Sequence, residues 1–451
     1  MRIRRFPGRL RRLPLKQSST KYVFITGTLL LTVAGVLTRI IGFFYRIFLS
    51  RTIGAEALGI YQLIAPVTAL GFAITAAGIQ TSVSKYVSAE MGRKNPAGAN
   101  LYLAIGLFLS LILSTLTGLF IHQNAAFLSH AWLGDPRCIP LLQVLSFSFV
   151  PCCIHACING YYYGLKKTAI PSLCQFTEQI ARVGSVYLMY FIAQSKGENL
   201  TLTMTIWGVV IGECASTLVS ISTFGSFDGI SEQMKHLIPF SKNLFTMALP
   251  LTANRLTLNL FATFENIMIP NRLKLFGYTN SEALSVYGIL TGMSMAIIMF
   301  PSVITNSISV LLLPTISEAK AAGNEHLIRQ TIKKTVFSCL FLGFLCTAGF
   351  VISGRFLGNF LFANALAGTF IVILGWICPF LYLSSTLSSI LHGLGHPGIT
   401  FCLNLFSCTI RILFVLVAIP MYGIRSYLVG ILVSQIFVAL SALFILSRKQ
   451  R

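Results

Sequence analysis

The sequence predicts an all-α polytopic membrane protein with about 12 transmembrane helices, arranged as two six-helix lobes that a pseudo-twofold axis relates around a central cavity. Composition is the first reason: 55% of the residues are hydrophobic and 10% are charged, whereas a soluble domain carries roughly 25% charged residues. The second is a series of apolar runs, all of which reach the roughly 20 residues that cross a bilayer. These runs cover 22–49, 58–84, 98–121, 139–164, 169–194, 203–224, 241–269, 283–313, 331–354, 366–391, 398–420 and 424–447.

Basic residues give the orientation. With the N-terminus inside, 22 of the 34 Lys and Arg residues fall in cytoplasmic segments and seven fall outside, which is the bias that topology signals produce. We therefore predict a multi-pass protein of the cytoplasmic membrane with both termini in the cytoplasm. No basic module interleaved with aromatic residues suggests nucleic acid. The predicted parts are a basic tail (1–21), a first lobe (22–224), a cytoplasmic linker (225–240), a second lobe (241–447) and a C-terminal tail (448–451).

An internal repeat is the third reason. The hexapeptide EALGIY at 56–61 recurs as EALSVY at 282–287, an offset of 226 residues. Arg182 recurs as Arg411, an offset of 229. Each half contains an even number of predicted helices, so the two halves share one orientation in the membrane, as in transporters built from parallel repeats. A substrate cavity is expected between them, near the bilayer midplane.

Five arginines remain inside the apolar runs. Arg39 and Arg46 are seven residues apart, which places them within about 20° of one helix face. One charged side chain at the bilayer centre costs at least ~3 kcal/mol, so two on one face suggest a watery cavity that holds an anion. The alternative is that both side chains extend to the headgroup layer.

The run 241–269 carries a matching polar face. Arg255, Asn259 and Asn266 fall within about 40° of one another on a helix, and this run is the repeat partner of the first. Arginine suits an anion site because its planar fork binds phosphate oxygens in pairs. A pyrophosphate group held between the lobes is therefore predicted.

Acids accompany some of the arginines. Glu178 and Arg182 have the spacing of an ion pair within one helix. In the second half of the repeat, Ser407 takes the position of Glu178. Arg411 therefore lacks an acid at that spacing, and we expect it to be free to contact a ligand. For Glu265 the alternatives are that it pairs with an arginine, titrates, binds a coupling cation, or is a helix-end acid near the outer interface. Our predicted substrate-binding residues are Arg39, Arg46, Arg182, Arg255, Arg411, Asn259, Asn266 and Asn404, and the predicted ion-coupling residues are Glu178 and Glu265.

Residues of the types that catalyse reactions or bind metals are present but do not form a recognisable site. Cys153, His155 and Cys157 are not predicted to bind a metal, because His155 points away from the face that the two cysteines share. The sequence contains no P-loop, and no Ser-His-Asp set is suggested. We therefore predict a transporter without enzymatic activity or a cofactor, with Na⁺ and H⁺ as the alternatives for a coupling cation.

Several stretches resemble the stage V sporulation protein B family: TRIIGFFYRIFLSRTIGAEALGIYQ (38–62), NRLTLNLFATFENIMIPNRL (254–273) and LSSTLSSILHGLGHPG (383–398) are three of them. That family belongs to the multidrug/oligosaccharidyl-lipid/polysaccharide exporter superfamily, alongside the lipid II flippases. The resemblance implies alternating access and a cargo of undecaprenyl-pyrophosphate-linked sugar, a peptidoglycan precursor for the spore cortex in sporulation members. Lipid II flippases carry a second arginine where this chain has Tyr45, and they have two further helices that are not predicted here.

The predicted function is therefore the flipping of a lipid-linked oligosaccharide, either a lipid II-type precursor or a polysaccharide repeat unit. Its partners would be that substrate, the bilayer and cell-wall synthases. The alternatives are a small-molecule exporter of the same fold, a membrane transferase acting on polyprenyl substrates, and a scaffold for cell-wall enzymes that transports nothing. The glycan, the energy source and the oligomeric state stay open.

Overall fold

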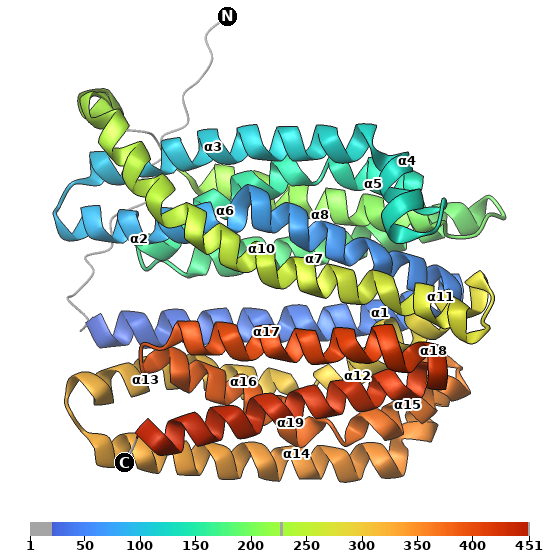
Figure 1. Ribbon diagram of the computed structural model, residues 1–451. Coiled ribbons are helices and arrows are strands. Elements are labelled where there is room, and N and C mark those ends of the chain that lie inside the picture. Colours follow the sequence, from blue (N-terminus) through green and yellow to red (C-terminus); the bar gives the residue numbers. More distant parts are fainter. Residues whose placement is uncertain (1–19, 226–228, 450–451) are drawn as a thin grey trace, which may run out of the picture.

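The computed structural model describes residues 20–225 and 229–449, and every regular element within them is a helix (Figure 1). This confirms the predicted all-α class. The basic tail predicted at 1–21 lies almost wholly outside the described residues.

The first lobe is formed by the helices that precede residue 225. They are α1 (Thr20–Phe72), α2 (Gly78–Gly92), α3 (Pro96–Gln123), α4 (Ala125–Phe127), α5 (Cys138–Ser146), α6 (Phe149–Gly164), α7 (Ala169–Ser195) and α8 (Leu202–Thr223). One bend divides α1, because Gly54 has φ 82° and ψ 175°, a backbone conformation that glycine adopts readily. The first two apolar runs are thus one interrupted helix.

Two elements lead to the second lobe, α9 (Ile230–Gln233) and the long α10 (Leu237–Phe276). The second lobe then contains α11 (Asn280–Gly288), α12 (Met295–Met299), α13 (Ser302–Ala321), α14 (Glu325–Phe362), α15 (Ala365–Gly375), α16 (Cys378–Gly393), α17 (Pro397–Leu413), α18 (Ile419–Tyr422) and α19 (Ile424–Lys449). Short π-helical segments at 73–77, 128–133, 289–294 and 414–418 and a 3₁₀ turn at 234–236 join some of these helices.

Local sequence explains several helix starts. The Asn95 side chain accepts a hydrogen bond from the Gly98 backbone N–H at 3.0 Å, and Pro96 occupies the first turn of α3, where it loses no intrahelical bond. At α11, Thr279 and Glu282 bond each other's backbone N–H groups in a capping box. These caps fix the boundaries of helices whose faces then pack against neighbours.

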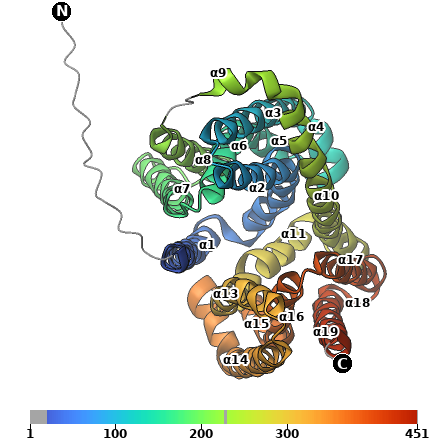
Figure 2. The same ribbon diagram turned by 90° about the vertical axis from the view of Figure 1, so that its left-hand side faces the viewer.

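The two lobes lie side by side, with α1, α10 and α11 between them (Figure 2). Viewed along the helices, α2, α3, α6, α7 and α8 form one group and α13, α14, α16, α17 and α19 form the other. Helix α10 runs between both groups and packs against α2 as well as α17. Helix α10 begins at Leu237, inside the linker predicted at 225–240. The predicted boundaries of the two lobes and the linker stay predictions.

The two ends of the molecule differ in how the lobes meet. We call the end where α1 begins and α19 ends the terminal end, and the opposite end, where Gly54 bends α1, the distal end (Figure 1). In the distal half one apolar core spans both lobes and includes Leu58, Leu142, Leu284 and Phe370. In the terminal half the core of the described residues is divided between the lobes, and the first-lobe part includes Leu244 and Ala248 of α10.

Glycine permits the closest distal approach. A Cβ on Gly288 would lie 2.2 Å from the Ala55 carbonyl oxygen and 2.5 Å from the Gly59 nitrogen, so these positions require a residue without a side chain. The Arg51 guanidinium also crosses between the lobes and donates to the backbone carbonyls of Phe360 and Leu361. The lobes are therefore joined at the distal end.

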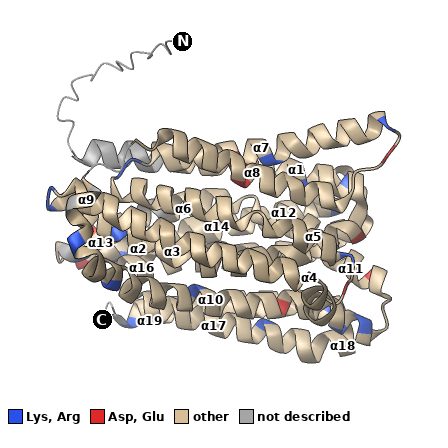
Figure 3. Cartoon of the chain, turned by 90° about the horizontal axis from the view of Figure 1, so that it is seen from above, with Lys and Arg blue, Asp and Glu red and all other residues tan. Residues whose placement is uncertain are grey.

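Among the described residues, seven helices are long and apolar enough to cross a membrane, and up to nine if two bent helix pairs each count as one span. Helices α7 and α10 are not among the seven, because polar and charged residues along their length lower their mean hydropathy. Lys and Arg gather mainly at the two ends of the helices (Figure 3). The protein is a multi-pass membrane protein, and the number of twelve spans stays a prediction.

Candidate functional site

Arg39 and Arg46 line one pocket between the lobes. Both arginines project from α1, and the opposite wall comes from α12, α13 and the turn between them, with Phe300, Ser302 and Asn306 among its residues. The pocket has a volume of about 330 Å³, and both arginines are solvent-accessible. The seven-residue spacing thus places two guanidinium groups on the wall of one inter-lobe space.

The polar face of α10 turns toward the first lobe. Arg255 Nη2 donates to Thr81 Oγ1 at 3.5 Å, and Asn259 Nδ2 donates to the Ala69 carbonyl at 3.1 Å. Asn266 Oδ1 accepts from the Tyr287 hydroxyl at 3.1 Å. Asn259 and Asn266 line a second inter-lobe pocket of about 240 Å³. The predicted stripe therefore contacts α2 through Arg255, α1 through Asn259 and α11 through Asn266. Arg255 is not among the residues that line the pocket of Arg39 and Arg46.

The second-lobe cluster consists of Arg411, Glu265 and Tyr427. Arg411 Nε donates to Glu265 Oε1 at 2.8 Å, and the Tyr427 hydroxyl donates to the same oxygen at 2.7 Å. Glu265 is 4% exposed. The expectation that Arg411 is free for a ligand is therefore wrong: its acid comes from α10 rather than from its own helix. Glu265 takes the first of its predicted roles, the partner of an arginine, and Asn404 lies half-buried on α17.

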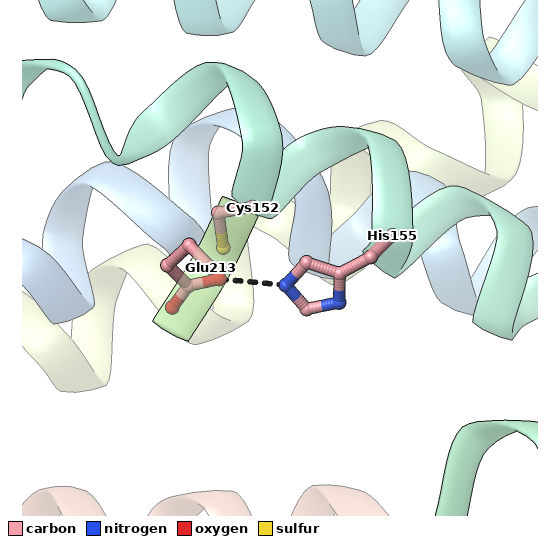
Figure 4. Close-up of side chains that lie close together, drawn as sticks. All are labelled: Cys152, His155 and Glu213. Atoms are coloured by element: carbon pink, nitrogen blue, oxygen red, sulfur yellow. Dashed lines mark hydrogen bonds and ion pairs between the residues drawn. The ribbon is translucent and has the colours of Figure 1, made fainter. Parts of the chain in front are cut away.

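The first-lobe cluster consists of Arg182, Glu178, Glu213, His155 and Cys152. Arg182 Nη2 lies 2.5 Å from Glu178 Oε1, which confirms the predicted pair, and 3.7 Å from Glu213 Oε1. His155 Nε2 lies 2.6 Å from Glu213 Oε2 (Figure 4). All five residues line a cavity of about 440 Å³ inside the first lobe.

Sequence reasoning missed part of this cluster. Cys152, and not Cys153, shares a face with His155, three residues further along α6, and that spacing was visible in the sequence. The approach of Glu213 was not visible, because α8 and α6 are brought together only by tertiary packing. The five arginines thus do not meet in one site: Arg39 and Arg46 line one pocket, whereas Arg182, Arg255 and Arg411 have other partners.

A polar network closes the distal end. Arg137 bonds Glu56 at 2.7 Å, Ser281 donates to Glu56 at 2.6 Å, and Asn280 donates to Asp135 at 3.0 Å. Burial opposes ionisation of Asp135, but hydrogen bonds from the side chain and backbone of Arg137 and from Asn280 outweigh it and lower the pKa of this carboxyl below its ordinary value. The network joins residues of α1 and the α4–α5 connection to the start of α11.

Comparisons with known proteins agree with this arrangement. Residues 24–320 match the family described as "Polysaccharide biosynthesis protein". "Stage V sporulation protein B" of Bacillus subtilis (strain 168) is 27% identical over 432 residues, which cover 93% of this chain and 83% of that protein. "Lipid II flippase MurJ" of the same organism is 24% identical over 352 residues, which cover 70% and 62%.

Among solved structures, the chain superposes with a TM-score of 0.76 and 13% identity on one described as "Inward-facing conformation of a multidrug resistance MATE family transporter of the MOP superfamily". The match covers 96% of this chain and 98% of that one, and it shows a shared fold. Together these findings confirm the resemblance that the sequence motifs indicated and the two-lobed architecture.

Proposed function

We propose that this chain, which belongs to the polysaccharide biosynthesis protein family, flips an undecaprenyl-pyrophosphate-linked oligosaccharide across the cytoplasmic membrane by alternating access. Two relatives carry the names of a sporulation protein and a lipid II flippase. A lipid II-type precursor is accordingly the proposed cargo, with spore cortex synthesis as the proposed process and cell-wall synthases as proposed partners. The protein itself catalyses no reaction in this proposal.

The pocket of Arg39 and Arg46 is the observation that carries the proposal. Two permanently charged guanidinium groups face an inter-lobe space, and pocket-lining Ser302 and Asn306 add further polar groups. A diphosphate offers the paired oxygen atoms that guanidinium groups bind in a bidentate manner. A cationic cargo would be repelled by the same wall, which disfavours the exporter alternative.

The arrangement of the lobes supports alternating access. One core joins them in the distal half, and their cores separate in the terminal half. With the terminal end in the cytoplasm, as the charge bias predicts, this conformation is open inward and its central space faces the leaflet where the precursor is made. Opening outward requires the distal network around Glu56, Arg137 and Ser281 to separate.

A coupling cation belongs to the proposal. Glu265 is engaged by Arg411 and Tyr427, whereas Glu178 shares one arginine with a second carboxylate, Glu213. The first-lobe cluster thus has two carboxylates and one arginine. Glu178 is therefore the better of the two predicted ion-coupling residues for Na⁺ or H⁺.

The test replaces Arg39 and Arg46 by Ala, singly and together, and measures the appearance of a lipid-linked precursor headgroup on the outer face of proteoliposomes or cells. We expect each single variant to lower the translocation rate at least about tenfold, because one charge-assisted contact contributes roughly 1.5–3 kcal/mol. Arg355→Ala is the matched control, since Arg355 is an exposed arginine on α14. Unchanged translocation in the double variant would refute the binding role of the pocket.

A further inference from the structure

We infer that the first-lobe cluster is a binding site for a divalent transition metal of the zinc class, with Cys152, His155 and Glu213 as its protein ligands. The ligand atoms of these three residues lie within 4.8 Å of one another, and they come from two packed helices, α6 and α8 (Figure 4). The proposed diphosphate pocket of Arg39 and Arg46 does not depend on this site, and metal binding is measured without transport.

Geometry is the first argument. Zn²⁺ binds Cys sulfur at about 2.3 Å and His nitrogen or carboxylate oxygen at about 2.0–2.2 Å, in tetrahedral sites where ligand atoms lie roughly 3.5 Å apart. His155 Nε2 and Glu213 Oε2 are already 2.6 Å apart, and Cys152 lies on the same face of α6, less than one turn before His155. Side-chain rotations alone can therefore close the set around an ion. All three residues line the 440 Å³ cavity, whose volume leaves room for a water molecule as the fourth ligand.

An unpartnered oxygen supports the ligand role of His155. Asn159 is 8% exposed, its Oδ1 atom lacks a hydrogen-bond partner, and its Nδ2 atom lies 3.5 Å from His155 Nδ1. A half-turn of the amide places Oδ1 opposite Nδ1, where it accepts the Nδ1 proton. That arrangement directs the Nε2 lone pair toward Glu213 and Cys152, as the outer partner of a metal-bound histidine commonly does.

Charge is the third argument. Two carboxylates, Glu178 and Glu213, lie beside one guanidinium group, Arg182, and a pair of buried acids favours an additional cation. A divalent ion that displaces the Cys152 proton to water adds one net positive charge to the cluster. The imidazole proton moves from Nε2 to Nδ1, so about one proton is released for each ion bound.

The thiolate determines which cation the site prefers. Cysteine sulfur and imidazole nitrogen favour Zn²⁺ and Co²⁺ over Mg²⁺ and Ca²⁺, which prefer oxygen ligands. The ion is expected to reach the cluster from the inter-lobe space, because Ala65 and Ala69 line both this cavity and the inter-lobe pocket of Asn259 and Asn266.

The experiment titrates the purified full-length protein, reduced and in detergent, with Co²⁺ and records the thiolate-to-cobalt charge-transfer absorption. We expect one Co²⁺ per chain, displacement by Zn²⁺ and no displacement by excess Mg²⁺. Cys152→Ser should abolish the band, His155→Gln and Glu213→Gln should weaken binding at least about tenfold, and Asn159→Ala should weaken it roughly 10- to 100-fold.

Two neighbouring cysteines provide matched controls. Cys153 turns toward Ser114, 3.1 Å away on α3, and Cys214 is exposed beside Glu213, so Cys153→Ser and Cys214→Ser should keep the band. Absence of cobalt binding, or a full band in Cys152→Ser, would overturn the proposal. If Cys152→Ser does not purify as a folded protein, His155→Gln decides: binding equal to that of the unaltered protein would refute the site.

Discussion

Arg182 and Arg411 occupy equivalent places in the two lobes and have different partners. Arg182, on α7, meets Glu178 of its own helix and Glu213 of α8. Arg411, on α17, meets Glu265 of α10, and Tyr427 completes the hydrogen bonding of that carboxylate. Arg182 is thus shared by two acids. Arg411 has a single acid, and the carboxylate of that acid also accepts a hydrogen bond from Tyr427.

The difference shows which of the two clusters has buried polar atoms without hydrogen-bond partners near it. Arg182 Nε and Asn159 Oδ1 are buried without hydrogen-bond partners, and among the described residues no such atom belongs to the second-lobe cluster. A buried group without a partner costs free energy, so Asn159 Oδ1 can still accept a hydrogen bond and Arg182 Nε can still donate one when a further group enters the cavity. The second-lobe cluster is suited to hold α10 against α17.

The largest effect should come from breaking the second-lobe pair. Glu265→Gln leaves the half-buried Arg411 without a counter-charge, and we expect the free energy of unfolding to fall by up to about 3 kcal/mol. A denaturant titration in detergent measures this. The double variant Glu265→Leu/Arg411→Met, which removes both charges, should lose less, and a single variant as stable as the unaltered protein would contradict the comparison.

A second change makes the lobes more alike. Ser407, which is 4% exposed, occupies the position that corresponds to Glu178, so Ser407→Glu adds a buried carboxylate one turn before Arg411. We expect a loss of about 2–3 kcal/mol, greater than that of the uncharged Ser407→Gln in the same titration. In the Glu265→Gln background the same substitution should stabilise, because it supplies Arg411 with an acid, and failure of this rescue would count against the pairing.

Removing one of the two first-lobe acids should have a smaller effect. Glu178→Gln leaves Arg182 with Glu213 at 3.7 Å, so we expect a loss of about 1 kcal/mol, the contribution of an ordinary hydrogen bond. The comparison between the lobes fails if this loss, measured in the same way, equals that of Glu265→Gln.

The smallest effect should come from protonating Asp135 at the distal end, where the two lobes meet. The pKa of Asp135 is lowered in the folded state, so its ionised form stabilises the fold above the ordinary pKa of 3.8 and this stabilisation is lost as the pH falls below that value. Thermal unfolding followed from pH 7 to pH 3 should show this loss. Asp135→Asn should show a shallower dependence, and an identical pH profile would exclude Asp135 as its source.

Sequence reasoning succeeded where the relevant partners were close in the chain. The spacing of Arg39 and Arg46 placed both on one face of α1, and the spacing of Glu178 and Arg182 gave their ion pair. It failed for Arg411, because its acid lies 146 residues earlier in the chain. It also passed over Cys152 and His155, whose third partner, Glu213, is 58 residues beyond His155.

The sequence by itself determined the class of the protein, because long apolar runs must become membrane helices when backbone polar groups cannot remain unpaired in lipid. The internal repeat predicted the two lobes. Periodicity also fixed which side chains share a helix face. Only the tertiary structure decided which faces meet, since packing brings α6 to α8 and α10 to α17 over distances in the chain that no local pattern encodes. It therefore decided which arginines are neutralised by an acid and which face the space between the lobes.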